Sequence, residues 1–214
     1  MKLYLIRHGE SQGNLEGKIQ GSMDFPLSSL GEKQVDLIGS FFKDIHLDTL
    51  YSSDLTRAYE TAKKIGEVKD VTIHTWDKIR EVHLGPMQGL TREEIKVKYP
   101  ITQEKSIITS GIAGTETVDE LTARCEYVLD QLTKVHKKDS VALVSHGGFI
   151  SIFLMYLISK EQWSTLQRPF VIGNTSVTLV EWQVEQDTPL IHYTNRTAHL
   201  DSLNVEQQAK RGVL

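Results

Sequence analysis

The sequence has little cysteine and no long apolar run. Its one cysteine, Cys125, cannot form an internal disulfide, which excludes the class of small secreted proteins held together by several bridges. No apolar run approaches the roughly 20 residues that a helix needs to cross a bilayer. The apolar stretch Leu3 to Ile6 is too short for the core of a signal peptide. We therefore expect a cytoplasmic protein that has no membrane partner.

Positive charge is also in short supply. The chain has 24 Lys and Arg against 28 Asp and Glu, a formal net charge of -4. Proteins that bind nucleic acid hold its phosphate backbone with broad basic surfaces, so we expect no nucleic-acid partner. If a protein of this charge binds phosphate, its cations must be concentrated in one pocket.

The length and composition indicate one ordinary globular domain. Hydrophobic residues make up 39% and charged residues 24% of the 214 residues, and a chain of this size buries enough surface to fold without disulfides. No internal repeat, low-complexity run or Pro/Gly/Ser-rich linker divides it. The prediction is a single domain over residues 1–214. Cys125 is expected in its core, because apolar residues recur around it at helical spacing.

Strand-like and helix-like segments alternate along the chain. The apolar patterns predict strands at residues 2–6, 47–52, 140–144, 177–184 and 190–193. They predict helices at about 31–45, 55–65, 91–99, 117–135 and 149–158. A turn is expected near Asp187 and Pro189, between the last two strands. This alternation indicates an α/β fold, a three-layer α/β/α sandwich whose central sheet is mostly parallel.

Capping residues mark the start of three of these helices. Thr91 and Thr117 are each followed three residues later by a glutamate, which is the capping-box pattern. Pro100 must end the first of these two helices. The helix at 55–65 is expected to begin at a side-chain cap from Ser53 or Asp54.

Polar clusters follow three of the predicted strands at the point where each strand ends. Residues 7–14 follow the first strand, residues 52–57 the second, and residues 145–148 the strand at 140–144. In open parallel sheets, ligands bind at the carboxyl ends of the strands. We therefore expect these three clusters to meet at one rim of the sheet.

The first cluster contains Arg7, His8 and Gly9. The strand end fixes the imidazole, and Gly9 lets the backbone approach a ligand. The reference pKa of histidine, about 6.5, leaves a well-populated neutral nucleophile near pH 7. The alternative is a surface histidine beside an ordinary arginine, which this cluster alone does not exclude.

The third cluster repeats this arrangement with His146, followed by Gly147, Gly148 and an apolar helix. Two glycines before a helix leave backbone N–H groups free to face an anion, and the helix dipole favours negative charge there. The alternative is a tight strand-to-helix turn in which the histidine is incidental.

Arg57 and Glu81 are the other two candidates. Arg57 lies in the first turn of its predicted helix, an unfavourable place for a cation unless an anion is nearby, and its planar fork can bind two phosphate oxygens. Glu81 lies in a segment without periodicity, and a protonated carboxyl group beside phosphate can donate a proton to a leaving oxygen. Taken singly, each is more typical of an ordinary surface residue than of a catalytic one.

Four segments together resemble the histidine phosphatase superfamily, in the branch that contains cofactor-dependent phosphoglycerate mutases and related phosphatases. They are RHGES at residues 7–11, TRAYETA around Arg57, EVHLGPMQG from Glu81 and SHGG around His146. Their order matches that of the family, and they span nearly the whole chain. The resemblance implies a phosphoglycerate mutase-like form of the three-layer fold, with a cap-like insertion at about 77–115.

By the same resemblance, His8 is the nucleophile that attacks phosphorus in line and becomes transiently phosphorylated. Arg7, Arg57 and a protonated His146 complete the phosphate pocket, where they neutralise the equatorial oxygens. Glu81 matches the family's proton donor. The resemblance therefore implies a catalytic set of five residues.

The resemblance also implies supporting positions. Asn14 helps to hold the phosphate, Gln20 and Gly21 lie at the edge of the pocket, and Gly147 belongs to the substrate-binding set. It implies no cofactor, and no metal, because positive side chains supply what a cation otherwise would. The sequence contains no HExxH or paired-cysteine pattern that would indicate zinc.

Three functions remain open, two enzymatic and one not. Mutases of this branch carry adjacent arginines in the insertion, whereas Tyr99 to Gly114 contains Lys105 but no arginine. We therefore expect a histidine acid phosphatase-type hydrolase of small-molecule phosphate monoesters, with a cofactor-dependent phosphoglycerate mutase as the first alternative. The second alternative is a catalytically inactive phosphate-binding protein, against which the intact set of His8, Glu81 and His146 argues. A homodimer is compatible with the sequence, which does not identify the natural substrate.

Overall fold

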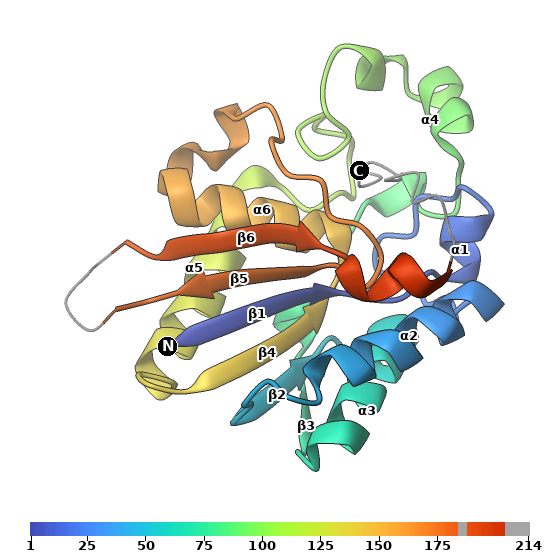
Figure 1. The fold of residues 1–214 in the computed structure, drawn as a ribbon. Coiled ribbons are helices and arrows are strands. Elements are labelled where there is room, and N and C mark those ends of the chain that lie inside the picture. The colour runs from blue at the N-terminus through green and yellow to red at the C-terminus, as the bar shows by residue number, and fades with distance from the viewer. Residues whose placement is uncertain (184–187, 204–214) are drawn as a thin grey trace.

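The computed structural model describes residues 1–183 and 188–203. Its centre is a six-stranded sheet with the strand order β3-β2-β4-β1-β5-β6. The four strands from β3 to β1 run parallel, and β5 and β6 are each antiparallel to the preceding neighbour (Figure 1). The bounds are Lys2–Arg7 for β1, Thr49–Ser52 for β2, Ile73–Thr75 for β3, Ser140–Ser145 for β4, Val177–Glu181 for β5 and Leu190–Arg196 for β6.

Helices cover both faces of this sheet, so the predicted three-layer sandwich is confirmed. α5 (Val118–Val135) and α6 (Gly147–Ser159) lie on one face, and α2 (Ser29–Phe42) and α3 (Thr56–Lys69) lie on the other (Figure 1). The side chains of β1 alternate between the two layers: Leu3 and Leu5 pack into the core beneath α5 and α6, and Tyr4 and Ile6 into the core beneath α2 and α3.

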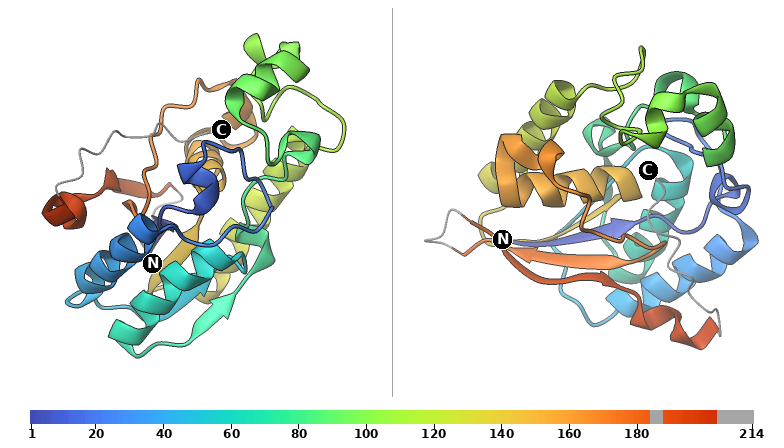
Figure 2. Two further views of the ribbon diagram at one scale, coloured as in Figure 1. Left: turned by 90° about the vertical axis from the view of Figure 1, so that its right-hand side faces the viewer. Right: turned by 90° about the horizontal axis from the view of Figure 1, so that it is seen from above.

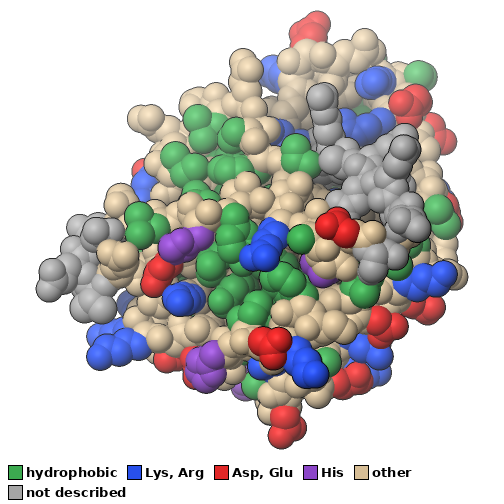
Figure 3. Space-filling view, in the orientation of Figure 1, with side chains coloured by type: hydrophobic (Ala, Val, Ile, Leu, Met, Phe, Trp, Pro, Cys, Tyr) green, Lys and Arg blue, Asp and Glu red, His purple; other side chains and the backbone are tan. Residues whose placement is uncertain are grey.

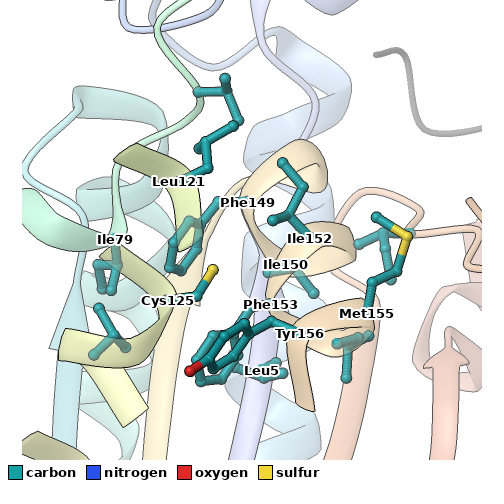
Figure 4. Packing of buried hydrophobic residues seen from close by; sticks show 14 of the residues in the cluster. Leu5, Ile79, Leu121, Cys125, Phe149, Ile150, Ile152, Phe153, Met155 and Tyr156 are labelled. Atoms are coloured by element: carbon teal, nitrogen blue, oxygen red, sulfur yellow. The ribbon is translucent and has the colours of Figure 1, made fainter. Parts of the chain in front are cut away.

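The α5–α6 layer holds the lone cysteine. Cys125 is fully buried, and burial raises the pKa of its thiol to about 12. Its side chain lies close to Phe149 and Phe153 of α6 (Figure 4). The prediction that Cys125 is a core residue is confirmed. Within the part of the chain that is described, no helix is both long and apolar enough to cross a membrane.

The two capping boxes are present as predicted. Thr91 precedes α4 (Arg92–Lys98) and Thr117 precedes α5, and in each case the threonine and the glutamate three residues later bond to each other's backbone N–H. α4 ends before Pro100, which opens a short 3-10 helix, η3 (Pro100–Gln103). These local patterns therefore fixed the limits of the helices they flank.

The predicted cap of α3 is wrong. The cap position is Leu55, which makes no side-chain capping bond. Instead, the carboxylate of Asp24 accepts hydrogen bonds from the backbone N–H (2.9 Å) and the hydroxyl (2.6 Å) of Thr56. Asp24 lies 32 residues earlier in the chain, so no local pattern could reveal this cap.

Other elements were not predicted, because they are short. They are the edge strand β3, α1 (Gln12–Leu15), and the 3-10 helices η1 (Asp77–Ile79), η2 (Gly85–Met87), η4 (Lys160–Thr165) and η5 (Ala198–Leu203). The last two predicted strands are present as β5 and β6. The predicted end of the first of them, at residue 184, and part of the turn between them, at Asp187, lie outside the described residues.

The segment with α4 and η3 stands apart from the sheet, beside the carboxyl ends of β1 and β4 (Figures 1 and 2). Its two ends meet in a narrow neck. The N–H of Glu116 donates to the carbonyl of His83 (2.8 Å), and Leu84 pairs with Thr115 in a single antiparallel bridge. Residues 85–114 therefore form a closed loop that leaves and re-enters the domain at one place.

Candidate active site

His8 and His146 lie side by side at the rim of the sheet. β1 and β4 are adjacent and parallel, with Arg7 opposite Ser145, so each histidine is the first residue beyond its strand. The ring centroids are 5.1 Å apart, with 56° between the ring planes. The exposed fractions of the two residues are only 2% and 0%. The expectation that these clusters meet at one rim is thus confirmed for both imidazoles.

The ring of His8 is held in one orientation by its own backbone. Nδ1 lies 2.6 Å from the carbonyl of Gly9, so Nδ1–H donates and Nε2 keeps its lone pair. Burial lowers the pKa of His8 well below its ordinary value, and the charges of Arg57 and Arg7 lower it further. The ring is therefore neutral, which is the state a nucleophile needs.

His146 is fixed by a serine. Its Nε2 lies 2.8 Å from the hydroxyl of the fully buried Ser53. Its buried Nδ1 has no hydrogen-bond partner among the described residues. Burial and the charge of Arg57 hold the pKa of His146 well below its ordinary value. The expectation that His146 is protonated is therefore wrong for this pocket as it stands, because burial and the neighbouring guanidinium groups both disfavour the charged ring.

Arg7 and Arg57 bring two buried cations to the rim. Arg7 is 4% exposed and donates to the carbonyl of Ile172 (2.7 Å). Arg57 is 1% exposed and donates to the carbonyls of Gly21 (2.9 Å) and Met23 (2.8 Å). Burial lowers the pKa of each to about 10, so both are charged at neutral pH.

Several N–H groups of this pocket remain available. The Nε atoms of Arg7 and Arg57, like Nδ1 of His146, are buried and find no hydrogen-bond partner within residues 1–183 and 188–203. Buried polar atoms without partners are rare in folded proteins and need an explanation. A bound anion supplies one, because it would accept from these donors and balance two buried charges.

Glu81 lies between η1 and η2 and is bound to the start of α6. Its two carboxylate oxygens accept from the backbone N–H groups of Val82 (2.9 Å), Gly148 (3.0 Å) and Phe149 (2.9 Å). The expectation that the N–H of Gly148 faces a ligand is therefore wrong, because the carboxylate of Glu81 occupies it. The acidic side chain is held at the same strand-to-helix turn that carries His146.

Gly147 has a packing role that the motif did not reveal. A Cβ built on it would lie 3.3 Å from Nε and 3.4 Å from Cζ of Arg7, which is closer than most side-chain contacts allow. A side chain here would force the guanidinium of Arg7 to shift by a few tenths of an ångström. The glycine thus provides the space that one of the pocket cations occupies.

The three supporting residues predicted from the loop after β1 lie around the same rim. Asn14 Oδ1 accepts from the N–H of Ser11 (3.2 Å), and Gln20 Oε1 accepts from the Ser11 hydroxyl (2.8 Å). The carbonyl of Gly21 accepts from Arg57. Gly21 thus supports Arg57 of the pocket, whereas Gln20 supports Ser11 in the loop after β1.

Two further residues of the rim were missed. Ser53 was interpreted as a helix cap, although it contacts His146. Asn174 donates to the carbonyl of His8 (3.1 Å) and to Oδ1 of Asn14 (3.3 Å). Asn174 precedes β5, whose antiparallel direction places its amino end at this rim. The sequence did not reveal that β5 is antiparallel, so Asn174 could not be placed at the rim.

His83 is exposed, and its Nδ1 lies 2.7 Å from the hydroxyl of Ser22. No group of three or more His, Cys, Asp or Glu side chains suited to a metal ion occurs in the described part of the chain.

Comparisons with known proteins agree with this geometry. The model of the histidine phosphatase superfamily (branch 1) matches residues 3–195. Phosphoserine phosphatase 1 of Hydrogenobacter thermophilus is 31% identical over 212 residues, which cover 96% of this chain and 97% of that protein.

Two solved structures have the same fold. YhfR of Bacillus stearothermophilus has a TM-score of 0.83 at 27% identity, with 93% of this chain and 98% of that one covered. A mycobacterial glucosyl-3-phosphoglycerate phosphatase has a TM-score of 0.79 at 28% identity, with 91% and 98% covered.

Proposed function

The chain belongs to branch 1 of the histidine phosphatase superfamily, and from that membership we propose that it hydrolyses small-molecule phosphate monoesters through a phosphohistidine on His8. One observation carries this proposal: a neutral imidazole with a free Nε2 lies beside a second imidazole and two buried arginines. The relatives named phosphoserine phosphatase and glucosyl-3-phosphoglycerate phosphatase support hydrolysis of small esters.

In the first step, Nε2 of His8 attacks phosphorus in line, and the bond from phosphorus to the ester oxygen breaks. Nε–H of Arg7 and of Arg57 donate to the phosphoryl oxygens, where negative charge must be neutralised. Ser53 donates to Nε2 of His146, which leaves the proton on Nδ1 of His146 to serve as a third donor. Glu81, in its protonated form, gives its proton to the departing alcohol and becomes a carboxylate.

In the second step, water attacks the phosphohistidine and the bond from nitrogen to phosphorus breaks. Glu81 now accepts the proton of the attacking water, so it returns to its initial state after one turnover. Phosphate leaves, and His8 is again neutral. The low pKa of His8 supports activity of the acid phosphatase type, because the nucleophile stays unprotonated below pH 6.5.

Turnover of p-nitrophenyl phosphate by the purified wild-type chain, between pH 5 and 8, tests the proposal. We expect hydrolysis that persists in EDTA, and an acid-labile phosphoenzyme after rapid quenching. No turnover by protein shown to be folded by circular dichroism would favour the inactive phosphate-binding protein. Interconversion of 2- and 3-phosphoglycerate after priming with the bisphosphate, at a rate above that of hydrolysis, would favour the mutase.

A further inference from the structure

Arg124 of α5 is a largely buried cation that the proposed reaction does not use. Figure 3 shows Lys and Arg side chains spread over the outer surface of one face of the molecule, whereas the side chain of Arg124 is only 11% exposed. Its Nε lies 3.0 Å from a carboxylate oxygen of Glu116, whose side chain is 16% exposed. Taking two charges out of water is costly, and their mutual attraction offsets the cost only in good geometry and with further hydrogen bonds. Both side chains make such further contacts.

The first of these contacts holds the main chain that leads to Glu81. Nη1 of Arg124 donates to the carbonyl of Arg80 (3.1 Å), and this carbonyl belongs to the peptide group that joins Arg80 to Glu81. One residue earlier, the carbonyl of Ile79 accepts from the buried hydroxyl of Ser145 (2.7 Å). The chain that enters Glu81 is thus bound at two successive carbonyls, one by β4 and the other by α5.

The second contact is with the residue that binds the carboxylate of Glu81. Cζ of Arg124 lies 4.8 Å from the centroid of the Phe149 ring, an arrangement in which the face of the ring attracts the cation. Phe149 is fully buried between α5 and α6 (Figure 4), and its backbone N–H donates to Oε1 of Glu81 (2.9 Å). Arg124 therefore contacts both the main chain before Glu81 and a residue that holds its side chain.

Glu116 extends this arrangement to the main chain after Glu81. One of its carboxylate oxygens pairs with Arg124, and the other accepts from the N–H of His83 (3.0 Å). The N–H of Glu116 in turn donates to the carbonyl of His83 (2.8 Å). The ion pair thus binds the chain on both sides of Glu81, at Arg80 before it and at His83 after it.

We infer that Arg124 is a positioning residue for the reaction: together with Glu116 it holds Glu81 where the carboxyl group reaches the leaving oxygen. This inference rests on the proposed hydrolysis, in which Glu81 is the acid. A general acid must lie within hydrogen-bond reach of the atom that it protonates, and a small misplacement lowers the rate strongly. Loss of Arg124 should therefore impair protonation of the leaving group more than attack by His8, whose ring is held by the carbonyl of Gly9.

Two aryl esters of similar size test the inference. p-Nitrophenyl phosphate releases a stable anion that departs without a proton, whereas phenyl phosphate releases a more basic oxygen that needs one. kcat/KM is measured for both, because it compares the free enzyme and ester with the transition state. We expect Arg124→Met to lower the ratio of kcat/KM for phenyl phosphate to that for p-nitrophenyl phosphate by about 10- to 100-fold, a part of the 10²- to 10⁴-fold that a general acid contributes. A merely structural role would lower both values equally.

Further variants assign the effect. Glu81→Gln removes the acid itself and should give the largest loss in the ratio. Glu116→Gln removes the charge that faces Arg124 but keeps an oxygen for the N–H of His83, so it should give a smaller loss of the same kind. Arg124→Lys keeps the charge without the planar fork and should recover part of the ratio. Lys134→Ala breaks an exposed ion pair on the same helix and should leave both esters unchanged.

The outcomes separate this inference from the proposed function. If Glu81→Gln lowers the ratio but Arg124→Met and Glu116→Gln keep it at the wild-type value, the positioning role is refuted and the phosphatase stands. If Arg124→Met does not fold, as judged by circular dichroism, Glu116→Gln decides alone. An unchanged ratio in Glu81→Gln would remove Glu81 as the acid and refute the inference, while hydrolysis would stand. If the folded wild type hydrolyses neither ester, the proposed function fails, and the inference fails with it.

Discussion

The phosphate pocket and the cationic cavity are both rich in arginine, yet they are built in opposite ways. The pocket lies at strand ends, its four basic residues are at most 4% exposed, and backbone carbonyls or a buried serine hold them. The cationic cavity, of about 230 Å³, is lined by α4, η3, irregular segments and the half-buried Arg92 and Arg168. The phosphate pocket is thus held by the sheet, whereas the cationic cavity depends on a loop attached to it.

The largest difference in turnover between variants of the two regions should follow removal of the nucleophile, His8. We expect His8→Ala to reduce turnover of p-nitrophenyl phosphate on the order of 10⁴-fold or more, as for other enzymes that lose their nucleophile. Labelling of the protein by a phosphate ester should disappear as well. Arg168→Ala, in the other region, should retain both. A stable phosphoenzyme in His8→Ala would assign the nucleophile to another residue.

Two glycine substitutions compare the packing of the regions. A Cβ at Gly31 would lie 2.0 Å from the carbonyl oxygen of Glu10, in the loop behind His8, whereas a Cβ at Gly111 meets nothing within 4 Å. Gly31→Ala should therefore lower the free energy of unfolding by about 3 kcal/mol, through overpacking. Gly111→Ala should cost only about 1 kcal/mol, because its φ of +73° disfavours a side chain.

Urea unfolding followed by circular dichroism measures both costs. Equal destabilisation by the two substitutions would show that the loop is packed as tightly as the rim, which would contradict the contrast drawn between them.

The smallest expected effect concerns the protonation of the two pocket histidines, which should not change near pH 6.5. Because the pKa values of His8 and His146 lie well below 6.5, both rings should stay neutral as the pH falls through that value, while histidines of the urea-unfolded chain become charged. NMR titration of the ring signals, assigned by His8→Gln and His146→Gln, measures this directly. Protonation of either ring near pH 6.5 in the folded protein would show that the pocket is less well shielded than its burial indicates.

The low pKa values of His8 and His146 also make the stability of the protein depend on pH. A buried ring that stays neutral binds fewer protons than the unfolded chain, so the free energy of unfolding should decrease as the pH falls below about 6.5. The decrease continues until the folded protein takes up the same protons.

The rim was predictable because its residues are placed by a general rule. Ligand sites form at the carboxyl ends of parallel strands, so His8 and His146 could be placed together from the strands that precede them. Contacts between distant segments were not predictable. The cap that Asp24 provides for α3, and the approach of Asn174 to His8, both depend on tertiary packing that no local pattern encodes.

The cavity was missed for a related reason. Arg92 lies in a predicted helix and Arg168 in a stretch without a motif, and they are 76 residues apart. Residues 99–114 contain no arginine. The cavity beside them is nevertheless lined by Arg92 and Arg168, which lie outside that range. The fold, rather than any one segment, supplies the charge of the insertion.

The narrow neck at Leu84 and Thr115 makes the insertion exchangeable. The entropy cost of closing a loop rises only with the logarithm of its length, about 0.6 kcal/mol for each doubling, so a shorter or longer loop can replace residues 85–114 at little expense in stability. Glu81 precedes the neck and is bound to α6, so such a transplant would leave the acid in place. One catalytic body can thereby evolve, or be engineered, toward many different esters.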